Sequence, residues 1–139
     1  MLKQILFGGE SGLSVPANAG LTLLRLFAGI ALLMSHGMGK IPPSEGFINN
    51  TANLGFPIPT LFAWAAALSE SLGGAFLAIG LFTRPAAFFI CCTMLTALLG
   101  VHRNDPFGKQ ELAFMYLFIA GAFLLMGAND WSLDRFLRK

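Results

Sequence analysis

Long apolar runs separated by polar, proline-rich stretches dominate the pattern along this chain. Four runs stand out, covering residues 18–38, 59–81, 85–101 and 111–128. Each holds about 17 to 23 residues, enough to cross a hydrocarbon layer ~30 Å thick at ~1.5 Å per residue. Four helices buried in a soluble protein would carry a polar stripe, and these runs lack one. The pattern predicts an all-α integral membrane protein with four transmembrane helices.

The stretches between the runs have the composition of loops and turns. Residues 40–59 contain four prolines and two glycines, so we expect a long loop there. Between the second and third runs we expect a tight hairpin, with Thr83 capping the third helix and Pro85 in its first turn. We find no internal repeat and no signal-peptide pattern, so residues 1–139 are expected to form one membrane domain that keeps its first helix.

Basic residues set the expected orientation. Four spans bring both termini to one side, which would carry Lys3, Arg84, Arg135, Arg138 and Lys139. The other side would carry Lys40, Arg103 and Lys109. An excess of Lys and Arg marks the cytoplasmic side, so the sequence predicts an up-down-up-down bundle with both termini in the cytoplasm. The tail at residues 130–139 alternates apolar and basic residues and is typical of an anchor at the membrane surface, with Trp131 at headgroup level.

Composition narrows the class of partner. The chain of 139 residues is 55% hydrophobic and 12% charged, whereas soluble domains are about 25% charged. Its main partner is therefore the lipid bilayer, and a net charge of +2 is too small to indicate nucleic acid. The adjacent Cys91 and Cys92 match no zinc or redox spacing, so we expect two small buried apolar side chains.

One carboxylate, Glu70, lies near the middle of the second run. A charge at that depth costs at least ~2.5–3.5 kcal/mol on insertion scales, so Glu70 should face the bundle interior and be protonated, hydrogen-bonded or paired. We expect Arg25 as its partner, since antiparallel helices would leave about 6 Å between the two depths. Such a pair either locks two helices together or serves as a buried acid with its counter-charge.

A second set of polar residues is expected at the end of the bundle away from the two termini. His36 and Lys40 end the first run, His102 ends the third, and Glu111 begins the fourth. At one membrane depth these four would close a polar mouth, which could relay protons, hydrogen-bond a quinone carbonyl or bind a metal. They could equally do no more than reach lipid headgroups. Because the spacing matches no metal-ligand signature, no metal site is predicted, and a helix N-terminus favours Glu111 in any case.

Five segments carry a resemblance to a known family: LLRLFAGIALLMSHGMGK, ALSESLGGAFLAIGLFTRPAA, VHRND, QELAFMYL and MGANDWSLD, in this order. Over about residues 20 to 135 the chain resembles the DoxX family of small four-helix bacterial and archaeal membrane proteins. The resemblance implies a four-span bundle in a prokaryotic inner (cytoplasmic) membrane. The positions that match the family pattern are Arg25, His36, Gly37, Lys40, Glu70, Gly80, Arg84, Glu111 and Asp134.

The resemblance also suggests a redox role. Family members are named as small subunits of thiosulfate:quinone or quinol-oxidase systems, or as oxidoreductases tied to quinone or thiol stress. No haem, flavin or iron–sulfur motif is visible in this chain, so we expect an accessory subunit that uses quinone rather than an autonomous enzyme. The expected catalytic residues are Glu70, Arg25, His36 and His102. The expected cofactor-binding residues are Lys40, Arg84 and Glu111.

Two other classes of function stay open at this point. One is a non-enzymatic membrane scaffold that recruits soluble redox enzymes through its cytoplasmic tail. The other is a small transporter or lipid-binding protein that uses the same polar interior for its ligand. Assembly of several copies into an oligomer is also left open. An ordered ligand in the bundle would separate the ligand-binding classes from the scaffold.

Overall fold

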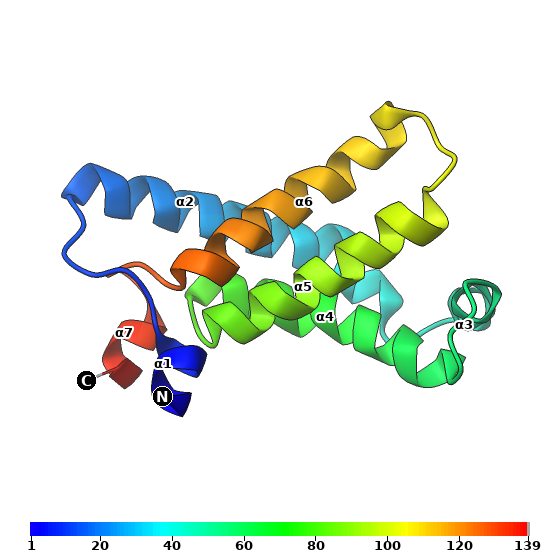
Figure 1. The fold of residues 1–139 in the computed structure, drawn as a ribbon, viewed down its shortest axis with the longest axis horizontal. Helices are drawn as coiled ribbons and strands as arrows, with labels where there is room; N and C mark the ends of the chain where they lie inside the picture. The colour runs from blue at the N-terminus through cyan, green and yellow to red at the C-terminus, as the bar shows by residue number, and fades with distance from the viewer. Residues whose placement is uncertain (139) are drawn as a thin grey trace.

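Each of the four predicted spans is a helix in the computed structural model of the chain, which describes residues 1–138 (Figure 1). Within these residues no strand forms beyond an isolated antiparallel bridge between Gly9 and Gly127. In the described part of the chain, four helical segments are long and apolar enough to cross a membrane: Val15–Lys40, Pro59–Ile79, Thr83–Val101 and Phe107–Met126. Their ends lie within four residues of the predicted ones. The largest difference is in the fourth helix, which begins before Glu111 and not at it.

Two of the spans change their helical winding before they end. The first consists of α2 (Val15–Leu32), the π-helical η1 (Leu33–Gly37) and a 3₁₀ turn, η2 (Met38–Lys40). In the third span, α5 (Thr83–Thr96) continues into the π-helical η3 (Ala97–Val101). The other two, α4 (Pro59–Ile79) and α6 (Phe107–Met126), are regular throughout. A π-helical turn rotates the side chains that follow it, and such turns are frequent at functional sites.

The spans pack so that α4 contacts both α2 and α5, and α5 contacts α6 (Figure 1). Their shared core is apolar and consists mainly of Leu32, Leu77, Ile90, Met94, Leu98 and Phe123. Many large apolar side chains on the outside remain exposed, among them Phe27 and Phe118. Such a surface suits hydrocarbon, where exposed apolar groups carry no hydration penalty. Of the two cysteines, Cys91 is buried as predicted, whereas Cys92 is exposed on this outer surface.

Glycines let α2 and α4 approach closely. A Cβ added to Gly29 would lie 2.4 Å from the carbonyl oxygen of Gly74, and one added to Gly37 would lie 2.6 Å from Cα of Ser71. Later residues of α2 and η1 thus meet earlier residues of α4, so the two helices run in opposite directions where they touch. Small residues at such a contact are the usual way in which membrane helices pack, because they gain close van der Waals contact.

The proline-rich stretch after the first span is not the uninterrupted loop that its composition suggests. Residues 45–53 form a helix, α3 (Glu45–Asn53), which packs against α4. The hydroxyl of Ser44 accepts a hydrogen bond from the Phe47 amide at 3.2 Å, and Glu45 stands in the first turn. A serine cap followed by a carboxylate is a standard start signal for a helix, and it outweighs the flanking prolines and glycines.

The two termini lie at the same end of the bundle, where α1 (Leu2–Phe7) and α7 (Leu133–Arg138) contact each other (Figure 1). Asp134, which is fully buried, accepts hydrogen bonds from the amides of Phe82 and Thr83 at 2.8 and 2.9 Å. The prediction that Thr83 caps the third helix is therefore wrong. Its own hydroxyl has no partner among the described residues, and the cap comes from a carboxylate 51 residues away.

Candidate functional site

Glu70 faces the bundle interior, as its position in the second run predicts. Its side chain is only 5% exposed, and its Oε2 lies 2.5 Å from Nζ of Lys40, whose side chain is 32% exposed. The winding of η1 and η2 brings Lys40 to this point, and the contact of Gly37 with the Glu70 backbone keeps the two helices close. The Lys40 ammonium also lies 5.2 Å from the centre of the Phe47 ring on α3. The result is a nearly buried carboxylate whose cation remains partly accessible.

The predicted pairing of Glu70 with Arg25 is wrong. Because Gly37 lies level with Glu70, Arg25 sits twelve residues away along the helix, or about 18 Å at ~1.5 Å per residue. An offset of about 6 Å between Arg25 and Glu70 requires the first two spans to begin and end at the same depths. In the structure α2 is displaced toward the end of the bundle that holds the termini, so Arg25 lies beside Gly80 at the end of α4.

Arg25 instead joins a buried polar network with the segment that follows α6. It is 2% exposed, and it donates to Oδ1 of Asn129 at 3.1 Å and to the carbonyl of Trp131 at 2.8 Å. Asn129 in turn donates to the side chain of Asn18, and Asn18 donates to Asp130. These partners satisfy most of the polar groups that lipid could not, although Nε of Arg25 is buried without a hydrogen-bond partner within residues 1–138. The network therefore holds the bundle together and does not expose a reactive group.

The residues of the predicted polar mouth fall into two separate sets. The ring of His36, on η1, meets the ring of Tyr116, on α6, edge to face, with their centres 6.0 Å apart. His36 directly precedes Gly37, which lies against the backbone of Glu70, so the His36–Tyr116 contact is at the level of the Lys40–Glu70 pair. Together, Lys40, Glu70, His36 and Tyr116 form what we call the Glu70 cluster. It gathers residues from three of the four spans.

His102 belongs to the loop between the third and fourth spans. Its Nδ1 lies 2.8 Å from Oδ2 of Asp105, and this hydrogen bond is the largest cause of a lowered pKa for the Asp105 carboxyl. Its backbone carbonyl accepts a hydrogen bond from Gln110. Glu111 is exposed, and no ion pair within residues 1–138 includes it. His102 and Glu111 are therefore not joined to the Glu70 cluster by any hydrogen bond or ion pair in the described part of the chain.

Arg84 lies at the opposite end, beside the termini. Its Nη2 donates to the carbonyl of Leu125 at 2.9 Å, and its Nε is buried without a hydrogen-bond partner among the described residues. The seven predicted site residues thus lie in four places along the bundle. Only Lys40, Glu70 and His36 come together.

The donor set of the Glu70 cluster suits protons and hydrogen bonds better than a metal. Across residues 1–138, no three His, Cys, Asp or Glu side chains gather into a group that could hold a metal ion. The cluster offers an ammonium, a phenol and an imidazole as donors, and one carboxylate as acceptor. An ion pair in a low-dielectric setting can exchange a proton or hold a polar headgroup, because the field around it is weakly screened.

Sequence reasoning missed Tyr116 in the cluster and Asn18, Asn129 and Asp130 in the Arg25 network. The segment GANDWSLD carried a signal for the network, since it places four polar side chains within eight residues at the end of an apolar span. A tyrosine inside the fourth run carried the signal for the cluster, because its hydroxyl needs a partner in lipid. Neither signal names its partner, which depends on the offset between helices.

Comparison with known proteins gives one consistent result. The sequence pattern of the DoxX family matches residues 20–103. The chain is 36% identical over 128 residues to the inner membrane protein YphA of Escherichia coli (strain K12), covering 86% of this chain and 91% of that protein. It is 31% identical over 121 residues to a Bacillus subtilis (strain 168) protein named "Putative oxidoreductase CatD", covering 86% and 88% respectively. No solved structure gives a significant match.

Proposed function

This chain belongs to the DoxX family and is a multi-pass protein of the inner membrane, and on that basis we propose that it is a quinone-linked accessory subunit of an oxidoreductase system. The observation that carries the proposal is the Glu70 cluster, a nearly buried carboxylate with a partly accessible lysine inside an apolar bundle. The name of the Bacillus subtilis relative supports the redox assignment. The electrons for the proposed subunit would come from a soluble or membrane-bound partner enzyme that carries a flavin, haem or iron–sulfur centre.

We propose an up-down-up-down bundle with both termini in the cytoplasm. The end that holds the termini carries Lys3, Arg84, Arg135 and Arg138, and this basic excess supports the cytoplasmic assignment. A reporter that is active only in the cytoplasm, fused after residue 139, should be active. The same reporter inserted after Gly55, in the connection between α3 and α4, should be silent. A silent reporter after residue 139 would show that the C-terminal end lies outside the cytoplasm, and it would refute the proposed orientation.

The cluster would bind the headgroup of a quinone through its donors. The Lys40 ammonium, the Tyr116 hydroxyl and the His36 ring would donate hydrogen bonds to the two carbonyl oxygens. Quinone reduction takes up two electrons from the partner enzyme and two protons, and it converts both carbonyls to hydroxyls. Glu70 and His36 would pass those two protons, and water at the accessible Lys40 side of the cluster would replace them. A hydrophobic ring would pack against the neighbouring apolar side chains of the bundle.

Purification in a mild detergent, followed by extraction and mass spectrometry of bound quinone, tests this proposal. The wild-type protein should retain quinone. Glu70→Gln should retain at least tenfold less, because Glu70 holds the Lys40 ammonium in place and a hydrogen bond from a charged group contributes about 1.5–3 kcal/mol. Glu45→Gln, at an exposed carboxylate on α3, is the matched control and should behave as the wild type.

The other classes of function predict different results in the same experiment. A scaffold would bind no quinone in either form and would instead co-purify with a redox enzyme independently of Glu70. A lipid-binding protein or transporter would retain another apolar ligand, with the same loss in Glu70→Gln. Equal quinone content in the wild type and in Glu70→Gln would refute a quinone site at this cluster.

A further inference from the structure

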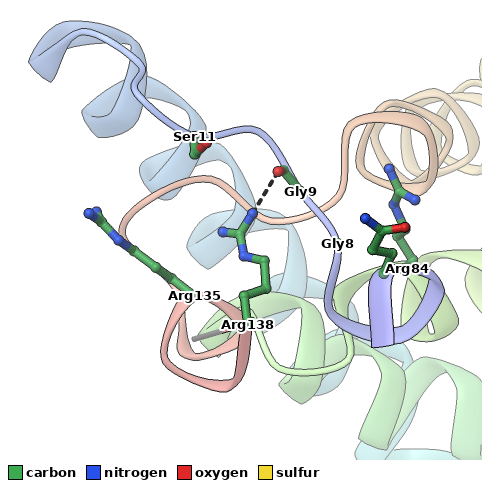
Figure 2. Close-up of a pocket in the computed structure, with 7 residues that line it drawn as sticks. Gly8, Gly9, Ser11, Arg84, Arg135 and Arg138 are labelled. Atoms are coloured by element: carbon green, nitrogen blue, oxygen red, sulfur yellow. Dashed lines mark hydrogen bonds between the residues drawn. The ribbon is translucent and has the colours of Figure 1, made fainter. Parts of the chain in front are cut away.

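A pocket of about 570 Å³ opens at the end of the bundle that holds both termini, far along the spans from the Glu70 cluster (Figure 2). We call it the arginine pocket. Among the residues that line it are Gln4, Gly8, Gly9, Arg84, Arg135 and Arg138. Figure 2 shows Arg138 reaching the carbonyl of Gly9, with Arg84 on the far side of the Gly8–Gly9 segment. Three elements meet here: α1, the start of α5 and α7.

The positive charge of the arginine pocket is largely uncompensated. Arg84 donates to the carbonyl of Leu125, and Arg138 donates to the carbonyls of Gly9 and Ala128 at 2.6 and 3.4 Å. Neither has an ion pair among the described residues, whereas Arg135 is paired with Asp130 at 3.2 Å. Arg84 Nε is buried and makes no hydrogen bond within residues 1–138. Carbonyl partners fix the positions of the two guanidinium groups without neutralising them.

The place of the pocket fits a membrane surface. Arg84 stands at the start of one span, and its partner Leu125 stands at the end of another. Leu125 is 81% exposed, and Phe88, one turn beyond Arg84 on α5, is also exposed. An apolar surface that faces acyl chains therefore adjoins the Arg84 guanidinium at headgroup level, and Arg138 lines the same pocket. The planar guanidinium group matches the geometry of a phosphate and can donate two parallel hydrogen bonds to two of its oxygens.

We propose that the arginine pocket binds the phosphate group of an anionic phospholipid, with Arg84 and Arg138 as its ligands and Phe88 and Leu125 beneath the acyl chain. Basic pockets between membrane helices bind anionic headgroups by the same physics. The Arg135 charge adds to the attraction and is partly cancelled by Asp130. This site is separate from the proposed quinone site, so either proposal can fail without the other.

The test uses the full chain, stripped of lipid in detergent and titrated with phosphatidylglycerol or with phosphatidylcholine, and bound lipid is counted by native mass spectrometry. The wild type should prefer phosphatidylglycerol. Arg84→Gln and Arg138→Gln should each raise its dissociation constant about fivefold, and together about 25-fold, on the scale of one basic residue near anionic lipid. Arg103→Gln removes a positive charge from the loop at the other end of the bundle and should leave binding unchanged.

Gln4→Glu covers the case in which the arginine variants lose their fold. Gln4 is exposed at the rim of the pocket, and its side chain makes no hydrogen bond within residues 1–138, so the change adds a carboxylate without breaking a contact. It should also weaken phosphatidylglycerol binding about fivefold. Binding of phosphatidylglycerol within twofold of the wild type in Gln4→Glu and in the folded arginine variants would overturn the site.

A titration with inorganic phosphate separates the two sources of the anion. Phosphate at millimolar concentration should displace little phosphatidylglycerol, because it lacks the acyl chain that Phe88 and Leu125 would cover. Phosphate binding as tight as that of the lipid, and lost in the arginine variants, would overturn the phospholipid as the source.

Discussion

The Lys40–Glu70 pair should respond asymmetrically to the loss of its two members. Lys40→Met leaves a carboxylate that is 5% exposed without a cation. Breaking a buried pair in this way costs about 3–5 kcal/mol in soluble proteins, and partial access through the Lys40 side reduces this to about 3 kcal/mol here. Glu70→Gln leaves a lysine that is 32% exposed, able to reach water and to donate to the amide oxygen. That variant should lose about 1 kcal/mol, the difference between a charged and a neutral hydrogen bond.

A double-mutant cycle tests this asymmetry. The double variant Lys40→Met/Glu70→Gln should cost about 1–2 kcal/mol, which leaves a coupling free energy of about 2–3 kcal/mol between the two sites. The free energy of unfolding would be measured in mixed micelles by titration with a denaturing detergent and followed by helix content. Lys109→Met, at an exposed lysine without an ion pair in the described chain, should stay within about 0.5 kcal/mol of the wild type. Equal losses in the two single variants, or simple additivity, would refute the reasoning.

Three further expectations concern other parts of the molecule. Asp134→Asn keeps one acceptor oxygen for the two amides at the start of α5 but loses the charge. It should therefore lower the free energy of unfolding by about 2 kcal/mol. An unchanged free energy of unfolding would mean that water replaces this cap. Hydrogen bonding, chiefly from Asn18, lowers the pKa of Asp130, so its contribution to stability is present above the ordinary pKa near 4 and is lost as the pH falls below it. Melting curves between pH 6 and pH 3 should therefore show a smaller acid effect in Asp130→Asn than in the wild type. Cys92→Ala should change the free energy of unfolding by less than about 0.5 kcal/mol, because its side chain is exposed, and Cys91→Ala should change it by about 1 kcal/mol, because its side chain is buried. Loss of quinone-linked activity in either folded variant would reveal redox chemistry at this pair.

Local patterns were sufficient to predict the four spans, because the length and the hydropathy of each segment indicate a membrane-spanning helix without reference to the rest of the chain. The inward orientation of Glu70 followed from the free-energy cost of placing a carboxylate in lipid, and it is confirmed by the burial of the side chain. Its partner could not be predicted in this way. Pairing depends on how far one helix slides along another, and that offset is set by the fit of Gly29 and Gly37 against α4. No property of Arg25 itself reports the offset.

The same limit explains the residues that sequence reasoning overlooked. The Ser44 cap that starts α3 is a local signal, so this helix is predictable from the sequence in spite of the prolines on either side of it. Asp134 differs, since the helix it caps begins 51 residues earlier in the chain. Asn129 and Tyr116 likewise act through partners on distant helices. Interactions that span the sequence are fixed by tertiary packing, and a single chain read alone carries no direct record of them.

The Arg25 network has a consequence for how the protein is made. Asn129 follows Arg25 by 104 residues, and at ~5–20 residues per second the ribosome needs about 5–20 s to add it. During that interval the first span is already synthesised while its guanidinium has no final partner. The nascent helix must therefore hold the charge at the bilayer surface or against the insertion machinery. Arg25 can therefore reach its buried position only after residues 129–131, which follow the fourth span, have been synthesised.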